Sequence, residues 1–152
     1  MELEDVFRTH QSSVYVYFLR MVGDVAEAEE LTQETFYRAC LSALRFRGES
    51  NVRTWLFGIA RHVFLERLRR TGRERPVRDV LDTPLHPSDP SERLSLEQAF
   101  AALRTADREV LMLVDVLGFE VGEAAVALDV TPGALRTRLH RARRRMRAEL
   151  SL

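Results

Sequence analysis

The sequence predicts an all-α protein built from two small helical domains joined by a flexible linker. Three observations support this fold class. Apolar residues recur at helical spacing through most of the 152 residues, no stretch alternates in the manner of a β-strand, and four of the five prolines fall between residues 71 and 90. We therefore expect an N-terminal domain over 1–70, a linker over 71–90 and a C-terminal domain over 91–152.

Three helices are expected in the N-terminal domain, over 2–22, 25–45 and 52–70. The first ends at Gly23, a residue that commonly terminates helices. The second opens after Asp24, and Glu27 three residues later gives the spacing of a capping box. The polar stretch 47–51 forms a loop before the third helix.

Four helices are expected in the C-terminal domain, over 92–104, 106–117, about 120–128 and from Thr131-Pro132 to the end of the chain. Ser91 and Thr105 are candidate caps of the first two, and Gly118 ends the second of these. Asp129 lies in the turn before the last helix, where it tolerates a left-handed backbone better than most residues. A threonine cap with a first-turn proline then opens that helix.

The last helix has an apolar side and a basic side. Its core side carries Leu135, Leu139, Ala142 and Met146. Together with the short helix and tight turn before it, this pattern predicts a helix-turn-helix, whose second helix enters the major groove of DNA. The candidate duplex contacts are Thr131, Gly133, Arg136, Thr137, Arg138, His140, Arg141 and Arg144. Phosphate contacts are expected from Arg141, Arg143, Arg144 and Arg145; a merely solvated charged helix is the alternative.

Two earlier helices carry further candidate surfaces. The second helix has an acidic stripe fringed with apolar side chains, which favours docking of a basic protein, although early carboxylates also suit the helix dipole. Its members are Glu27, Glu30, Glu34, Tyr37 and Leu41. The third helix interleaves aromatic residues with arginine, which suits single-stranded nucleic acid. One of its sides carries Arg53, Phe57, Arg61 and Phe64, and another carries Trp55, His62, Glu66 and Arg69. Packing of the aromatic rings against the first helix is the alternative.

Charge is segregated along a chain of zero net charge. Residues 1–50 and 79–130 carry −4 and −8, whereas residues 51–78 and 131–152 each carry +6. Such blocks suggest separate surfaces with separate partners. They also lead us to expect that, in the free protein, the acidic second domain folds against the basic end of the third helix and covers its DNA-binding surface.

Three stretches together resemble the extracytoplasmic-function class of bacterial RNA polymerase sigma factors. They are AEELTQETFYRA, FRGESNVRTWLFGIARHVFLERLRR and REVLMLVDVLGFEVGEAAVALDVTPGALRTRLHRARRRM, in that order. The resemblance implies promoter recognition and strand opening, with core polymerase as partner through its clamp and flap. It assigns clamp docking to the acidic helix, with Gln33 among its contacts. It assigns minus-thirty-five recognition to the helix-turn-helix, and minus-ten recognition to Phe46, Arg47, Ser50, Asn51, Arg53, Trp55, Arg61, His62, Glu66, Arg69 and Arg70.

The resemblance further implies an anti-sigma partner. A cytoplasmic location is expected from the single cysteine, Cys40, and from an acidic N-terminus that does not fit a secretory signal. The family often has Asn and Asp where His62 and Glu66 stand, and usually glycine where Asp129 stands. The first helix of the helix-turn-helix is unusually rich in alanine and carries Gly122, which weakens its helix propensity. Two alternative functions are a helix-turn-helix regulator that binds duplex DNA as a homodimer, and an inactive sigma-like protein that sequesters a partner. An enzyme is not expected, nor a cofactor, metal site, small-molecule substrate or membrane span, because the four histidines stand apart and no apolar run reaches about 20 residues.

Overall fold

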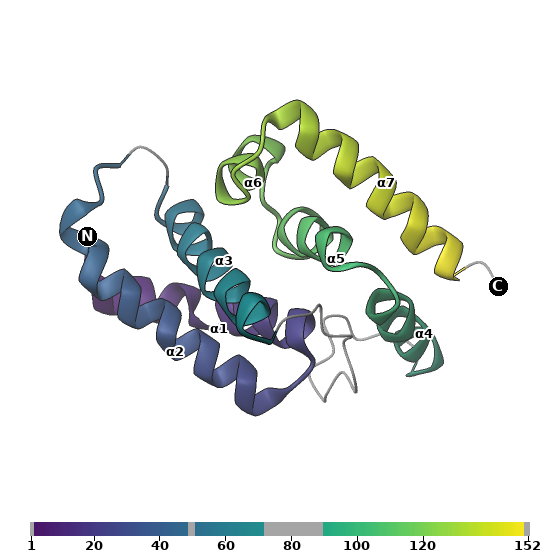
Figure 1. The fold of residues 1–152 in the computed structure, drawn as a ribbon, viewed down its shortest axis with the longest axis horizontal. Coiled ribbons are helices and arrows are strands. Elements are labelled where there is room, and N and C mark those ends of the chain that lie inside the picture. Colours follow the sequence, from purple (N-terminus) through teal and green to yellow (C-terminus); the bar gives the residue numbers. More distant parts are fainter. Residues whose placement is uncertain (1, 49–50, 72–89, 151–152) are drawn as a thin grey trace.

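The computed structural model describes residues 2–48, 51–71 and 90–150, and every regular element in those ranges is a helix (Figure 1). The first unit comprises α1 (Leu3–Val22), α2 (Val25–Ser42), the 3₁₀ turn η1 (Ala43–Arg45) and α3 (Val52–Thr71). The second unit comprises α4 (Pro90–Ala101), α5 (Thr105–Leu111), the π-helical turn η2 (Met112–Val116), α6 (Val121–Ala127) and α7 (Pro132–Leu150). The all-α fold class is confirmed. Most of the predicted linker, residues 72–89, lies outside the described residues.

Local signals in the first unit act largely as predicted. Gly23 adopts a left-handed φ of 71° and donates its N–H to the carbonyl of Leu19 at 2.8 Å, which ends α1. Asp24 accepts the N–H of Glu27 at 2.9 Å and so caps α2. The predicted capping box is only half formed, because the Glu27 carboxylate pairs with Arg67 of α3 at 3.2 Å.

Helix starts in the second unit differ from two predictions. Helix α4 begins at Pro90, which needs no N–H partner, so Ser91 lies inside it. Thr105 is not the cap of α5: Arg104 takes that position, and the Thr105 hydroxyl accepts a hydrogen bond from Arg108 at 3.4 Å. The turn before α7 follows the prediction, since Asp129 has a φ of +54° and Thr131 accepts the Ala134 N–H at 3.1 Å.

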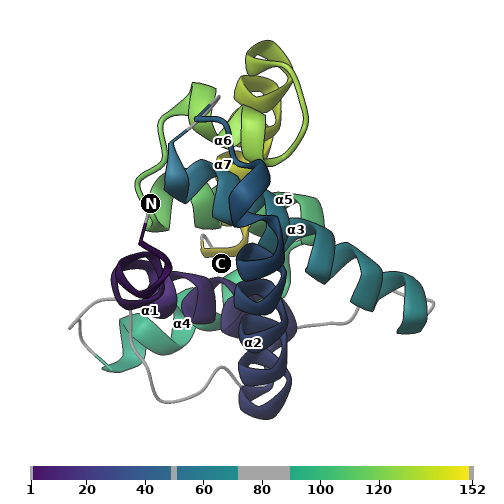
Figure 2. The same ribbon diagram turned by 90° about the vertical axis from the view of Figure 1, so that its left-hand side faces the viewer.

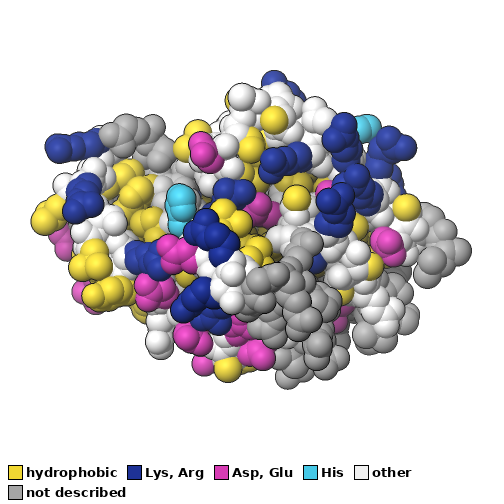
Figure 3. All heavy atoms as spheres, viewed as in Figure 1, with side chains coloured by type: hydrophobic (Ala, Val, Ile, Leu, Met, Phe, Trp, Pro, Cys, Tyr) yellow, Lys and Arg dark blue, Asp and Glu magenta, His cyan; other side chains and the backbone are white. Residues whose placement is uncertain are grey.

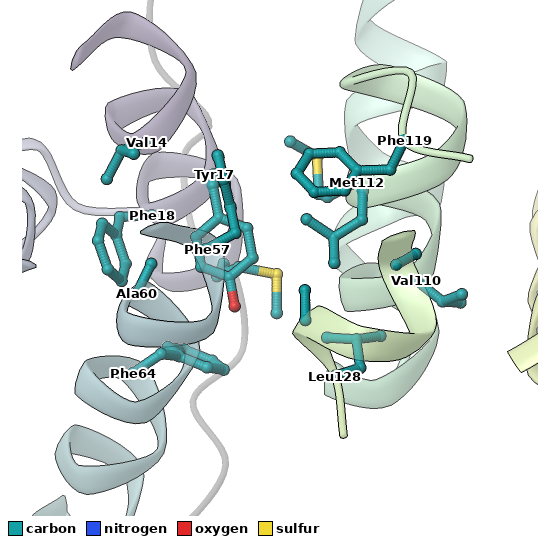
Figure 4. Close-up of a cluster of buried hydrophobic side chains, with 14 of the residues drawn as sticks. Val14, Tyr17, Phe18, Phe57, Ala60, Phe64, Val110, Met112, Phe119 and Leu128 are labelled. Atoms are coloured by element: carbon teal, nitrogen blue, oxygen red, sulfur yellow. The ribbon is translucent and has the colours of Figure 1, made fainter. Parts of the chain in front are cut away.

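The two units pack against each other and share one continuous apolar core. In both ribbon views α3 lies beside α6, and α1 also contacts α5 (Figures 1 and 2). Figure 4 shows Tyr17 and Phe57 of the first unit facing Met112 and Phe119 of the second. All four side chains are at most 2% exposed. Arg53 and Arg61, two of the minus-ten candidates on α3, contact the second unit.

Candidate nucleic-acid interface

Helix α7 separates its core side from a basic side, as its sequence predicts. Leu135, Leu139 and Ala142 are buried against the rest of the second unit. In Figure 3 the arginine side chains gather over α7. We call the exposed basic side the α7 face. Its members are Thr131, Gly133, Arg136, Thr137, His140, Arg141 and Arg144. A helix with small residues at its start and exposed arginines behind them has the shape and charge of a duplex-DNA reader.

Arg138, Arg143 and Arg145 of α7 do not belong to this face. Arg143 pairs with Asp115 at 2.6 Å, and Arg145 pairs with Asp107 at 3.0 Å. The phosphate contacts of both stay a prediction, and because acidic residues of the preceding segment already bind these side chains we expect them to contribute little. Arg138 is half-buried and its charge acts on Glu109.

Both phenylalanines of α3 belong to the core rather than to a base-stacking surface. Phe57 and Phe64 are 2% and 1% exposed, with ring centroids 5.6 and 6.2 Å from that of Tyr17. Phe57 also meets Phe119 edge to face at 5.2 Å. The predicted side of interleaved arginines and aromatics is thus corrected, since α1 and the second unit cover its rings. Trp55 is half-buried and packs on Phe46, with centroids 4.9 Å apart.

Three polar minus-ten candidates are bound by the second unit. Arg53 donates to the carbonyl of Leu117 at 3.0 Å and pairs with Glu123 at 3.5 Å. Asn51 caps α3 through the Thr54 N–H at 2.8 Å, and its side-chain amide contacts Glu123. Arg61 donates to Glu109 at 3.1 Å. The structure therefore holds these residues against the second unit at two places, one at Glu123 and one at Glu109.

The remaining minus-ten candidates lie along the open parts of the first unit. Arg47, His62, Arg69 and Arg70 are exposed. Ser50 lies outside the described residues. Their positions span both ends of α3, so they line an extended path rather than a single pocket. Exposed arginines along such a path suit a nucleic-acid backbone.

A chain of ion pairs connects α2 with α3. Arg38 holds Glu66 through two hydrogen bonds of 2.6 and 3.1 Å and Glu34 through one of 2.9 Å. These bonds lower the pKa of the Glu66 carboxyl, so Glu66 is ionised at neutral pH. Sequence reasoning missed Arg38, although its position four residues after Glu34 was the available signal. A side chain predicted to contact DNA is thus fixed by one on the acidic helix.

The acidic stripe of α2 is exposed except at one end. Gln33, Tyr37 and Leu41 are exposed, Glu34 is half-buried, and Glu30 remains largely exposed while pairing with Arg67 at 3.3 Å. Glu27 differs: it is only 8% exposed, so its predicted place on this face is corrected. We call the remainder the α2 face, defined by Glu30, Gln33, Glu34, Tyr37 and Leu41.

The surroundings of the α2 face include features that the sequence did not reveal. Leu44 of η1 is 94% exposed and extends the apolar fringe beyond Leu41. An open groove of about 830 Å³ runs between α2 and α3; its lining includes Glu34, Tyr37 and Arg69. Exposed apolar side chains beside carboxylates are suited to a protein partner. Within the part of the chain that the structure describes, there is no cluster of three metal-binding side chains, and no helix is long and apolar enough to cross a membrane.

Two family models match the chain, one in each unit. The model for sigma-70 region 2 matches residues 6–74, and the model for sigma-70 region 4 matches residues 93–146. The ECF RNA polymerase sigma factor SigC of Mycobacterium tuberculosis is 35% identical over 147 residues, covering 93% of this chain and 79% of that relative. SigX of Bacillus subtilis, another ECF sigma factor, is 31% identical over 160 residues, covering 97% and 82%.

Solved structures share the fold of the whole chain. The sigma factor RpoE of Bartonella quintana, in complex with the anti-sigma factor NepR, has a TM-score of 0.84 at 24% identity, with 98% of this chain and 96% of that chain covered. CnrH, in complex with the cytosolic domain of CnrY, has a TM-score of 0.75 at 22% identity, with 98% and 87% covered. At these identities the likeness concerns the arrangement of helices alone.

Proposed function

The chain belongs to the extracytoplasmic-function family of RNA polymerase sigma factors, and we propose that each of its surfaces performs one of the family's functions. The protein directs core polymerase to specific promoters and assists strand opening at the start of transcription. Family members regulate transcription, and we assign the bond chemistry of RNA synthesis to the polymerase. The assignments below connect each step with particular side chains.

The α7 face reads the minus-thirty-five element as duplex. The observation that carries this assignment is the clean division of α7, whose apolar side is buried while seven polar or small residues remain exposed. Gly133 lets the helix start approach the groove closely. Arg136 and Thr137 follow at the positions where a recognition helix meets base edges, and Arg141 and Arg144 suit the phosphates.

The exposed side of α3 and the loop before it engage the minus-ten element after the strands separate. Support comes from the open arginines at both ends of the path and from the Trp55–Phe46 ring pair near its start. Extruding a base costs a few kcal/mol, and a protein surface must offset that cost. We include Arg53, Arg61 and Asn51 in this surface, although the second unit binds them in the free chain.

The α2 face docks on the polymerase clamp, and the second unit contacts the flap. Exposed Tyr37, Leu41 and Leu44 provide apolar anchors beside Glu30 and Glu34, which suits a basic partner. Because the polymerase works in the cytoplasm, we place the protein there. We also propose an anti-sigma partner, since both structural neighbours are described in complex with another protein, NepR in one case and part of CnrY in the other.

Run-off transcription with purified core polymerase on a library of upstream sequences tests the proposal. We expect transcripts from a subset of templates that share two elements about two helical turns apart, with Arg136→Ala relaxing preference in the upstream element only. Absence of any selected start site in the presence of the protein would contradict it. If the anti-sigma partner exists, a second, smaller chain should co-purify with the protein from its own host. Recovery of the protein with polymerase alone would count against the anti-sigma partner.

A further inference from the structure

We propose that Thr137 reads the methyl group of a thymine in the minus-thirty-five element, and that it does so through its own methyl group rather than through its hydroxyl. The proposal rests on the assignment of the α7 face to that element. It adds which base is read at this position and by which atoms. Its support comes from the place of Thr137 on α7, the direction of its hydrogen bond, and the space beside Gly133.

Thr137 lies on the side of α7 that faces directly away from the core. It follows Leu135 by two residues and precedes Leu139 by two, and these leucines are only 0% and 5% exposed. Two residues make a little more than half a turn of an α-helix, so the Thr137 side chain points away from both. It is exposed, as are Arg136 and Arg141 on either side of it. When α7 lies in a major groove, Thr137 therefore faces the base edges rather than the phosphates.

The hydroxyl proton of Thr137 is already used within the helix. Its Oγ1 lies 3.1 Å from the carbonyl oxygen of Gly133, and it is the donor in this bond because a carbonyl oxygen only accepts. The hydroxyl therefore has no proton for the acceptors of the major groove, which are N7 and O6 of guanine, N7 of adenine and O4 of thymine. Two contacts remain: the methyl group can meet that of thymine, or the hydroxyl oxygen can accept from an amino group of adenine or cytosine.

A second exposed methyl group favours the first of these two contacts. Ala134 precedes Thr137 by three residues, so the two side chains are neighbours on the helix surface, and both are exposed. The C5 methyl of thymine is the apolar group that the major groove offers, and the side chains of alanine and threonine are among its usual contacts. Two adjacent methyl groups between the donors Arg136 and Arg141 thus form an apolar patch that suits thymine.

Gly133 lets a base pair come close to this patch. A Cβ added at Gly133 would meet nothing within 4 Å, and its φ lies outside the left-handed region. Neither packing within the chain nor the backbone conformation therefore requires glycine here, although glycine destabilises a helix relative to alanine. Close approach of another molecule is the remaining reason for a residue without a side chain. An added methyl group one turn from Thr137 would hold the DNA away.

Binding of promoter duplexes to the holoenzyme, assembled from the full chain and core polymerase, tests the proposal. The duplex carries the minus-thirty-five element that the parent holoenzyme selects. Each thymine of this element, on either strand, is replaced in turn by deoxyuridine, which lacks only the C5 methyl. We expect one position at which the replacement weakens binding by about fourfold, the effect of a methyl group that is no longer buried. A selected element without thymine, or one in which no replacement changes binding, would overturn the proposal.

Two substitutions at Thr137 separate its methyl group from its hydroxyl. Thr137→Ser keeps the hydroxyl and loses the methyl group, so it should bind the thymine and deoxyuridine duplexes equally. Thr137→Val keeps a methyl group and loses the hydroxyl, so it should retain the fourfold difference. If Thr137→Ser still distinguishes the two duplexes, another side chain reads the methyl group. If Thr137→Val no longer distinguishes them, the hydroxyl is required. Either result would refute the proposal.

Two further variants separate a lost contact from a damaged fold. Thr9→Ser removes an exposed threonine methyl group from α1, which has no assigned DNA contact, and should change neither binding nor the fourfold difference. Gly133→Ala should raise the urea midpoint, because alanine favours a helix, yet weaken binding to the thymine duplex. Effects of opposite sign on stability and binding are not expected of a purely structural glycine. Binding of Gly133→Ala at the parent level would refute the close approach.

The same measurements separate this proposal from the proposed function. A holoenzyme that selects promoters but binds them equally with thymine and deoxyuridine retains the proposed function and refutes the role of Thr137. A holoenzyme that selects no upstream sequence refutes the proposed function itself, and the role of Thr137 with it.

Discussion

Replacing Phe57 by alanine tests whether this ring belongs to the shared core or to a nucleic-acid surface. The side chain is 2% exposed and its ring lies 5.6 Å from that of Tyr17 and 5.2 Å from that of Phe119. Truncation of a buried phenylalanine costs about 3–5 kcal/mol, which includes the lost contacts and the cavity left behind. Against a total stability of about 5–15 kcal/mol, this loss lowers the urea midpoint substantially.

Phe7→Ala is the matched control for that substitution. Phe7 is 44% exposed and contacts a single ring, that of Phe36, at 5.0 Å. Its truncation should cost about 1 kcal/mol, near the average for point substitutions. Urea unfolding followed by far-ultraviolet circular dichroism measures both variants. If Phe57→Ala unfolds at the same urea midpoint as the parent chain, the ring does not stabilise the core, and a base-stacking role regains support.

Three further predictions concern DNA binding, the link between α2 and α3, and pH. Arg141→Ala should weaken promoter binding by the holoenzyme and reduce the slope of log affinity against log salt by about one, whereas Arg143→Ala should leave that slope unchanged. Arg38→Gln should cost about 1 kcal/mol or less in urea unfolding, since its pairs are partly exposed, yet alter which minus-ten sequences are selected by freeing Glu66. Burial raises the pKa of Glu109, so the folded chain holds this proton more tightly than the unfolded chain does. The contribution of this group to the free energy of unfolding is therefore fully present below the ordinary carboxyl pKa. It is lost as pH rises through the higher pKa of the folded chain. The urea midpoint of Glu109→Gln should lack this decline.

Elements set by local signals were predictable from sequence. Helix α7 combines a threonine cap, a first-turn proline and an unbroken apolar stripe, and the structure matches each of these features. Gly23 and Gly118 also end their helices with left-handed backbones, at φ of 71° and 75°. Such signals lie within a few residues of one another, so no knowledge of the tertiary fold is needed to read them.

Features set by residues distant in sequence were not predictable in the same way. Helix α3 is covered on two sides, by its own unit and by the second, so helical spacing could not separate the core rings Phe57 and Phe64 from surface rings. Glu27 fits the acidic stripe by spacing, but in the structure it is buried and forms an ion pair with Arg67, forty residues later. Charge blocks suggested that the units meet, whereas the role of Glu109 as acceptor for two residues of the first unit required the structure.

Arg53 and Arg61 contact the second unit, and we also propose them as minus-ten contacts, which constrains how this protein can diverge. A substitution at either position that changes promoter choice should also change the contact between the two units. His62 and Arg69 are exposed on the same helix, and among the described residues neither forms an ion pair with the second unit, so they can vary without that penalty. New promoter preferences should therefore arise first at the latter pair in descendants of this chain, while the two guanidinium groups facing the second unit change only together with their carboxylate partners.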